Sequence, residues 1–202
     1  TGGSGGIGAA IAARLGAEGV TVLVAYNRNR EAAEASAAAV AAAGGKGEAV
    51  QLDLRDADAV RAALEAAAAR HDGLHSVVGA HGPFITMRHI SRLEPALFAE
   101  TMAADAFAAY NLIHAAIPHL RASRGALVAM ATPAIRRYAV KDILSAAPKA
   151  AVEAVVKGVA AEEGRHGVRA NCVGVGVLTD GMYHALVEDG AFDDRFLEAS
   201  RA

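Results

Sequence analysis

The feature that most constrains this sequence is a glycine-rich segment that leads directly into a helical pattern. Residues 1–8 read TGGSGGIG, and AAIAARLGAEG follows without a break. Glycines let a backbone turn sharply and approach a pyrophosphate, while the next helix offers free N–H groups and the positive end of its dipole. A strand pattern follows at residues 20–26, the spacing of a β–α–β unit, which favours a dinucleotide-binding loop over a flexible tag. The residues predicted to surround the pyrophosphate are Gly2, Ser4, Gly6, Ile7 and Gly8.

Short β-branched runs alternate with longer alanine-rich stretches along the whole chain. The runs predict buried strands, and the alanine-rich stretches have the composition and spacing of helices. Strand followed by helix, five times over, predicts an α/β fold in which a doubly wound parallel sheet is covered on both faces, in three layers. The predicted strands are 20–26, 49–53, 76–80, 126–130 and 168–173, and the predicted helices are about 7–18, 30–43, 57–70, 95–120 and 146–163.

A dinucleotide-binding loop normally follows a strand, but this sequence begins at the loop itself. We therefore expect the first and most central strand to be absent. Strands 20–26 and 76–80 should then flank a gap, lying ~10 Å apart rather than at one strand spacing of ~4.8 Å.

Composition bounds the class of protein. The 202 residues are 53% hydrophobic and 21% charged with a net charge of −2, which predicts one folded domain over residues 1–202 and excludes a disordered chain. The low net charge gives no general attraction for nucleic acid, and no apolar run reaches the roughly 18 residues of a membrane span. A single cysteine, Cys172, allows no internal disulfide, so we predict a cytoplasmic protein without membrane or nucleic-acid partners.

The turn after the second predicted strand bears on cofactor choice. It reads Tyr26-Asn27-Arg28-Asn29-Arg30, with no acidic residue before Glu31. A carboxylate at this turn binds the ribose 2′-hydroxyl of NAD, whereas an arginine accommodates the 2′-phosphate of NADP. We therefore predict that Asn27 and Arg28 hold the 2′-phosphate and that NADP(H) is favoured over NAD(H); the alternative is that Arg28 and Arg30 are simply solvated residues at a helix start.

Taken together, these segments resemble the short-chain dehydrogenase/reductase family over nearly the whole chain. The resemblance is carried by TGGSGGIG, YNRNREAAEA, LDLRDADAV, SAAPKAAVEAVVKGVAAEEGRHGVRANCV and Thr179. It implies a Rossmann-type sheet, a nicotinamide cofactor, a small-molecule substrate and a homodimer or homotetramer. It also implies further chain at the C-terminal end, including a closing strand that is absent here. The cofactor-binding residues that it adds are Asp53 and Leu54 beside the adenine, and Gly79, Lys149, Gly176 and Thr179.

The catalytic positions depart from the family pattern. Lys149 matches the family lysine, but the residue four before it is Ser145 where the family has tyrosine. Thr132 stands at the position of the usual serine, and Asp105 at that of the usual asparagine. A serine hydroxyl is a far weaker acid than a phenol, so Ser145 is a poor proton donor and is predicted to be a helix N-cap or a ribose contact.

Another group must supply the proton if the chain is a catalyst. Pro148 predicts that its helix begins near Ser145, because proline is favoured in a first helical turn. Residues 133–144 then form a loop that could bring Tyr138 over the nicotinamide, as in family members that reduce dienoyl-CoA thioesters. The enoyl-reductase variant has its tyrosine at the position of Asp142, which disfavours that subtype. His81 is either a substrate-side donor or a turn histidine.

These residues support two hypotheses. The first is an NAD(P)H-dependent oxidoreductase that moves a hydride to or from a carbonyl or a conjugated enoyl or dienoyl thioester, with residues 179–202 as a substrate-side lid. The second is a dinucleotide-binding sensor or a catalytically weak subunit of a hetero-oligomer, because the tyrosine is replaced. His114 and His119 face different sides of a helix, and we predict no metal site.

Overall fold

The strands of the computed structural model form two parallel sheets. The structure describes residues 1–179, 181–190, 192 and 198. The first sheet has the order β1-β2 and the second has the order β3-β4-β5. The bounds are β1 (Thr21–Tyr26), β2 (Lys46–Gln51), β3 (Ser76–Gly79), β4 (Ala126–Ala131) and β5 (Arg169–Gly174). The predicted α/β class with parallel strands is confirmed.

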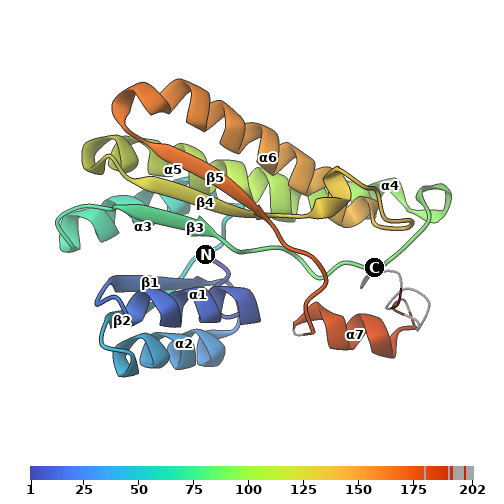
Figure 1. The fold of residues 1–202 in the computed structure, drawn as a ribbon, viewed down its shortest axis with the longest axis horizontal. Helices are drawn as coiled ribbons and strands as arrows, with labels where there is room; N and C mark the ends of the chain where they lie inside the picture. Colours follow the sequence, from blue (N-terminus) through green and yellow to red (C-terminus); the bar gives the residue numbers. More distant parts are fainter. Residues whose placement is uncertain (180, 191, 193–197, 199–202) are drawn as a thin grey trace.

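As expected, β1 and β3 are not paired with each other. The first three residues of the chain lie between them instead, near the point marked N in Figure 1. The Gly3 N–H donates to the Ala25 carbonyl of β1 at 3.3 Å, and the Ala80 N–H donates to the Thr1 carbonyl at 3.3 Å. The Thr1 amino group donates to the Val78 carbonyl of β3 at 2.7 Å. The start of the glycine-rich segment therefore joins the two sheets.

Most helices are close to the predicted ones. Their bounds are α1 (Gly6–Gly16), α2 (Arg30–Ala42), α3 (Ala57–Arg70), α4 (Pro95–Met102), α5 (Ala108–Ser123), α6 (Ile143–Glu163) and α7 (Met182–Glu188). The helices α2, α3, the pair α4 and α5, and α6 connect successive strands, whereas α1 precedes β1 and α7 follows β5. A five-residue π-helical turn, Ala103–Phe107, joins α4 to α5. Short 3₁₀ turns lie at Ile90–Arg92, Pro133–Ile135 and Gly164–His166.

Two hydrophobic clusters cover opposite faces of the strands, as the side-chain alternation of parallel strands requires. Val24 and Tyr26 of β1 pack with Ala33 and Val40 of α2 and with Ala12 of α1. The larger cluster joins α3, α5 and α6 to β3 and β4, and its fully buried members include Leu112, Leu120 and Leu127. Figure 1 shows α1 and α2 on one side of the strands, with α3, α5 and α6 on the other.

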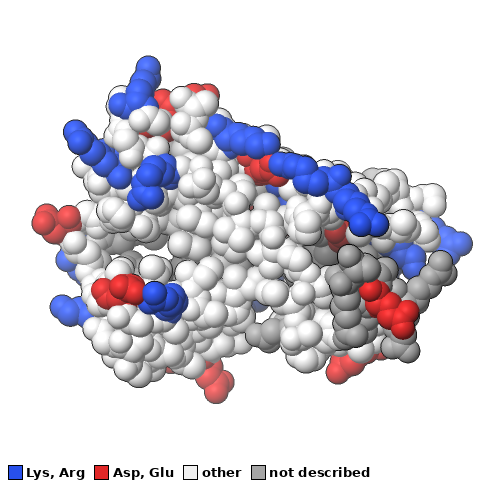
Figure 2. Space-filling model, in the orientation of Figure 1, with Lys and Arg blue, Asp and Glu red and all other residues white. Residues whose placement is uncertain are grey.

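One face of the second sheet forms an open apolar groove. The groove has a volume of about 500 Å³ and lies between the α1 side chains Ile7, Ile11 and Leu15 and the sheet side chains Val78 and Val128. These two valines alternate with Val77 and Leu127, which point into the core on the opposite face. The centre of the face drawn in Figure 2 carries few charged side chains.

Several element boundaries differ from those predicted, most of them by one to three residues. β2 begins at Lys46, three residues before the predicted strand, because its pairing with β1 starts opposite Thr21. α6 begins at Ile143, so Pro148 lies inside the helix and is fully buried. The segment predicted as a lid contains the short helix α7, and part of that segment lies outside the described residues.

Most of the apolar residues of α5 and α6 pack in the protein's own hydrophobic core. The family resemblance predicts that the apolar faces of two long helices are buried between subunits, with Ala104, Phe107, Ala108 and Leu112 on one and Val152, Val155 and Val159 on the other. In the structure Ala108, Leu112, Val152 and Val159 belong to the protein's own core, whereas Phe107 is 62% exposed. Among the described residues, no helix has the length and apolar character needed to cross a membrane.

Candidate active site

The glycine-rich segment forms a tight loop whose glycines are required by close backbone contacts. Gly2 has φ +68°, and a Cβ atom there would lie 2.5 Å from the Ala80 carbonyl oxygen. A Cβ atom on Gly8 would lie 2.2 Å from the Gly2 carbonyl oxygen, which also accepts the Gly5 N–H at 3.0 Å. Side chains at Gly2 and Gly8 are therefore excluded, and the loop backbone stays accessible to a ligand.

The N-terminus of α1 lacks a side-chain cap. Gly5 is the N-cap residue, and the first turn of α1 contains no acidic residue. The N–H groups of Gly6, Ile7 and Gly8 therefore have no acceptor within the helix, and the positive end of the dipole is not neutralised. This is the arrangement that the sequence predicted for binding a pyrophosphate, and Ser4 lies in the same loop.

Arg28 lies at the turn after β1 with an exposed side chain. Its neighbours are already engaged: Asn29 caps α2 by accepting the Ala32 N–H at 3.0 Å, and the Asn27 carbonyl accepts the Gln51 amide at 3.1 Å. Arg30 lies over the Tyr26 ring at 6.0 Å and pairs with Glu34. The guanidinium of Arg28 makes no ion pair within the described residues, which leaves it available for an anionic group.

Asp53 and Leu54 follow β2 at the same edge of the sheet. Arg55 donates its backbone N–H, Nε and Nη2 to the Asp53 carboxylate at 3.0, 3.1 and 2.7 Å. These hydrogen bonds lower the pKa of Asp53 to about 2, so the carboxylate is ionised at neutral pH. Leu54 is buried, and its carbonyl accepts the Asn111 amide at 2.9 Å.

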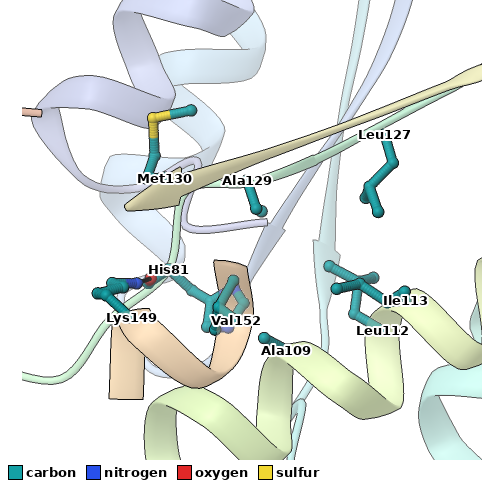
Figure 3. Close-up of a pocket in the computed structure, with 10 residues that line it drawn as sticks. His81, Ala109, Leu112, Ile113, Leu127, Ala129, Met130, Lys149 and Val152 are labelled. Carbon is teal, nitrogen blue, oxygen red and sulfur yellow. Dashed lines mark hydrogen bonds between the residues drawn. The ribbon is translucent and has the colours of Figure 1, made fainter. Parts of the chain in front are cut away.

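Lys149 is the centre of the predicted catalytic group. Its Nζ donates to the His81 carbonyl oxygen at 3.1 Å and to Asp105 Oδ1 at 2.8 Å. The first of these bonds is drawn in Figure 3, where Lys149 approaches the turn after β3 from α6. The Lys149 side chain is 14% exposed and that of Asp105 is 4% exposed. The structure therefore brings Lys149 and Asp105 together, as a buried ion pair.

Asp105 is a buried residue at the centre of the π-helical turn. Desolvation raises the pKa of Asp105, and the Lys149 ammonium opposes that rise. Gly82 lies beside both charged groups, since a Cβ atom there would be 3.7 Å from Lys149 Nζ and 3.9 Å from Asp105 Oδ2. Sequence reasoning placed Asp105 at this position but left its partner open.

His81 has a role that the sequence did not predict. Its Nδ1 lies 3.0 Å from Thr1 Oγ1, and its Nε2 is buried without a hydrogen-bond partner among the described residues. Burial lowers the pKa of His81 to about 3, so the ring is neutral. It lines a cavity of about 10 Å³ whose walls are otherwise mostly apolar, shown in Figure 3 with Leu112 and Leu127. The ring therefore points into the core, which favours the alternative of a turn histidine over that of a substrate-side donor.

Three predicted hydroxyl groups lie around the start of α6. Thr132 follows β4, and its Oγ1 accepts the Ala134 N–H at 3.3 Å. Ser145 is the third residue of α6, so it is not the N-cap; that position is Asp142, whose carbonyl accepts the Ser145 N–H at 3.1 Å. Tyr138 lies in the loop before α6 with 46% of its surface exposed, and its hydroxyl makes no hydrogen bond within the described residues.

The remaining predicted residues lie at the ends of strands. Gly79 is the last residue of β3 and lines the cavity beside His81. Gly176 and Thr179 follow β5 on an exposed segment, and a Cβ atom on Gly176 would meet nothing within 4 Å. The described residues hold no cluster of three or more His, Cys, Asp or Glu side chains that could bind a metal ion.

The comparisons with known proteins agree with this geometry. A family model described as enoyl-(acyl carrier protein) reductase matches residues 2–201. The chain belongs to the short-chain dehydrogenase/reductase family. A solved short-chain dehydrogenase from Burkholderia cenocepacia, in complex with NADP, is 33% identical with a TM-score of 0.82, over 90% of this chain and 74% of that one. A dehydrogenase/reductase from Sinorhizobium meliloti is 31% identical with a TM-score of 0.87, over 99% of this chain and 76% of that one.

A curated relative is longer than this chain. An L-fucose dehydrogenase from Oryctolagus cuniculus is 28% identical over 196 residues, which are 92% of this chain and 64% of that protein. The chain therefore spans less than two thirds of the length of that dehydrogenase.

Proposed function

We propose that this family member is an NADP(H)-dependent oxidoreductase that moves a hydride to or from a carbonyl or a conjugated enoyl or dienoyl thioester. The observation that carries the proposal is the uncapped N-terminus of α1 behind a loop in which Gly2 and Gly8 leave no room for side chains. A site of this form binds the diphosphate of a dinucleotide through backbone N–H groups. The match to a family model described as a reductase supports the hydride chemistry.

The residues present fit a nicotinamide dinucleotide. Gly2, Ser4, Gly6, Ile7 and Gly8 would surround the diphosphate, and Asp53 and Leu54 would lie beside the adenine. When bound, the dinucleotide supplies or accepts the hydride. Gly79, Gly176 and Thr179 are proposed to line the nicotinamide end of the site.

Arg28 supports the preference for NADP. Its guanidinium is exposed and makes no ion pair within the described residues, whereas Arg30 is engaged with Tyr26 and Glu34. Solved relatives include proteins with bound NADP and, at 22% identity, an NAD⁺-bound xylitol dehydrogenase. A guanidinium matches a phosphate group in shape and charge, and we therefore assign the 2′-phosphate to Arg28 and Asn27.

The catalytic residues are proposed from the same geometry. Lys149 would bind the ribose beside the nicotinamide, held by Asp105. The hydroxyls of Thr132 and Tyr138 would orient the substrate oxygen, and Ser145 would contact the ribose or the substrate. The described part of the segment from Thr179, which includes α7, would lie on the substrate side of the site; residues 180, 191, 193–197 and 199–202 of the predicted lid lie outside the described residues.

Cofactor binding and turnover should be tested separately. NADPH fluorescence on titration with the protein reports binding, and its loss after adding ketones, aldehydes or enoyl-CoA thioesters reports oxidation. We expect binding followed by oxidation with at least one class of substrate. Binding without oxidation across the panel would favour a dinucleotide sensor or a catalytically weak subunit, and an absence of binding would refute the proposal.

The role of Arg28 is tested by comparing two variants. Arg28→Ala should weaken NADPH binding about tenfold or more and leave NADH binding nearly unchanged, because only NADPH carries the 2′-phosphate. Arg30→Ala is the matched control, two residues away and already paired. Tighter binding of NADH than NADPH by the wild-type protein would contradict the assignment.

A homodimer or homotetramer remains a prediction, as does a cytoplasmic location. Phe107 and Tyr110 at the start of α5 are 62% and 53% exposed, so this end of the helix offers apolar surface for a second subunit. Size-exclusion chromatography with light scattering measures the assembly directly, and a monomer at high concentration would contradict the prediction.

A further inference from the structure

Two connections at the carboxyl end of the second sheet carry basic residues and no acidic ones. The first connection, residues 82–93, follows β3, and the second, residues 133–141, lies between β4 and α6. Gly82 opens the first connection beside the candidate site, since a Cβ atom there would lie 3.7 Å from Lys149 Nζ. Together the two connections contain five Lys and Arg residues and no Asp or Glu, in a protein whose net charge is −2. Positive charge is therefore concentrated next to the candidate active site.

A backbone hydrogen bond joins the two connections. The Arg88 N–H donates to the Lys141 carbonyl oxygen at 3.0 Å, so these two basic residues lie side by side. Lys141 has φ +74°, a left-handed conformation that costs a residue other than glycine roughly 1 kcal/mol. A glycine would adopt this conformation without that cost, and residues held in such conformations cluster at ligand sites. The backbone of Lys141 is thus fixed at the junction of the two connections.

Four of the five basic side chains make no ion pair within the described residues. Arg136 is the exception, because it is paired with Glu153 of α6. Asp142 and Glu94, the acidic residues next to the two connections, are not ion-paired within that part of the chain either. Figure 2 shows Lys and Arg side chains gathered along its upper right edge, over α6 and the segment before it. The unpaired, exposed basic residues are Arg88, Arg92, Arg137 and Lys141.

Apolar side chains are exposed next to these cations. Phe84 and Ile90 lie on the first connection, and Tyr138 and Val140 lie on the second. Val140 directly precedes Lys141 and is 67% exposed. A surface that combines exposed apolar groups with a few unpaired cations suits a ligand that has an apolar body and an anionic group.

The cations at this junction are separate from the one proposed to bind the ribose. Lys141 precedes α6, whereas Lys149 lies six residues after Ile143, the first residue of that helix. At the rise of an α-helix, six residues correspond to ~9 Å. An anion bound at the junction would therefore belong to a part of the ligand well away from the nicotinamide ribose.

We propose that Arg88 and Lys141 form an anion-binding subsite for the substrate; this inference rests on the proposed function. The substrate is then an amphipathic carbonyl compound whose apolar body carries a carboxylate or a phosphate group at a distance from the reacting carbonyl. A guanidinium binds either oxyanion through parallel N–H groups, and an ammonium adds a compact charge beside it. Arg92 and Arg137 strengthen the local positive potential that attracts such a substrate.

The first test compares matched substrates that differ only in charge. One pair is a medium-chain oxo acid and its methyl ester, and the other is a 3-oxoacyl-CoA and its N-acetylcysteamine thioester, which lacks the phosphates. We expect kcat/KM to be about tenfold higher or more for the anionic member of at least one pair, mainly through a lower KM. The preference should shrink as salt is added, because salt screens exposed charges. Equal kcat/KM within both pairs would overturn the inference.

The second test locates the subsite. Arg88→Ala and Lys141→Ala should each reduce the preference for the anionic substrate about three- to tenfold, and Lys141→Glu should reduce it further. Lys46→Ala is the matched control, since Lys46 is exposed at the amino end of β2, the opposite end from the site. The control should keep the wild-type preference. A preference that survives both alanine variants would overturn the assignment to Arg88 and Lys141.

The third test measures binding without turnover and distinguishes the two anions. Octanoate, octyl phosphate and octanol are titrated calorimetrically into the protein–NADPH complex. Tighter binding of octyl phosphate than of octanoate indicates a phosphate-bearing substrate, and the reverse order indicates a carboxylate. Both anions should bind more weakly to Lys141→Ala. If neither anion binds more tightly than octanol, the subsite is refuted.

Failure of this inference is distinguishable from failure of the proposed function. Oxidation of NADPH by neutral and anionic substrates at equal kcat/KM would refute the subsite and leave the oxidoreductase intact. A wild-type protein that does not bind NADPH would refute the proposed function and this inference together.

Discussion

Arg55 folds back over Asp53 and holds both oxygens of its carboxylate. Nε lies 3.1 Å from Oδ1 and Nη2 lies 2.7 Å from Oδ2, in the two-pronged geometry that suits a guanidinium and a carboxylate. The Asp53 side chain is still 36% exposed at the edge of the sheet. The pair therefore orients a charged acceptor at the place proposed for the adenine.

Asp53→Asn should weaken NADPH binding about three- to tenfold, because the amide accepts a weaker hydrogen bond and no longer fixes Arg55. The change should show as a larger Kd in the fluorescence titration. Asp58→Asn is the control, since Asp58 is 86% exposed on α3 and pairs only with Arg61 among the described residues. An equal Kd for Asp53→Asn and wild type would show that the Asp53–Arg55 pair stabilises the loop after β2 and does not contribute to NADPH binding.

Gly8→Ala should raise the Kd for NADPH at least tenfold. The new methyl group would lie 2.2 Å from the Gly2 carbonyl oxygen, so the loop must move away from α1 and the N–H groups of the first turn lose their alignment. Gly158→Ala in α6 is the control, because a Cβ atom there meets nothing within 4 Å. That variant should be stabilised by about 0.5–1 kcal/mol in urea unfolding, with an unchanged Kd. Normal binding by Gly8→Ala would contradict the close contact.

Glu163→Gln should lower the melting temperature. Glu163 lies at the end of α6, is 5% exposed and accepts hydrogen bonds from Arg121 of α5, which lower its pKa. A lowered pKa gives stability that is present above the unfolded value near 4.5 and is lost as pH falls through the folded value. The difference in melting temperature should therefore be constant above about pH 6 and shrink in acid. The exposed neighbour Glu162→Gln should show neither effect.

Asp142→Asn should have the opposite pH dependence. Burial raises the pKa of Asp142 to about 6, and its side chain does not cap α6. A raised pKa gives stability that is present below the unfolded value near 4 and is lost as pH rises to about 6. The variant escapes this loss and should be more stable than wild type by about 1 kcal/mol at pH 7.5. Urea unfolding at pH 4 and 7.5 measures the effect, and the exposed Asp72→Asn is the control.

Much of this fold could be predicted because its local signals agree. Alanine-rich stretches end at glycines, and β-branched runs lie between them, so α3 was predicted with its observed bounds. The start of α6 was misplaced for a physical reason. Pro148 favours a first turn, but the Asp142 carbonyl accepts two N–H groups upstream, from Ser145 and Ala146, and the helix forms before the proline.

The candidate site was predictable residue by residue but not in its pairings. The sequence singled out Lys149 and Asp105 separately, and the structure brings them into one ion pair. Asp105 lies in a π-helical turn, whose extra residue has no composition signal. The sequence left His81 open between a substrate-side donor and a turn histidine, and it did not predict that the ring is buried. Its burial follows from the side chains of α5, α6 and β4 that surround the same cavity, which no local pattern records.

Two backbone hydrogen bonds, from Gly3 N–H to the Ala25 carbonyl and from Ala80 N–H to the Thr1 carbonyl, connect the two sheets. They are made by the same short segment that faces the proposed ligand. The same segment is thus proposed both to bind the ligand and to hold the two sheets together. A bound diphosphate would stabilise the segment that connects the two sheets. Amide hydrogen exchange should therefore slow in both β1 and β3, including at residues that the ligand does not contact.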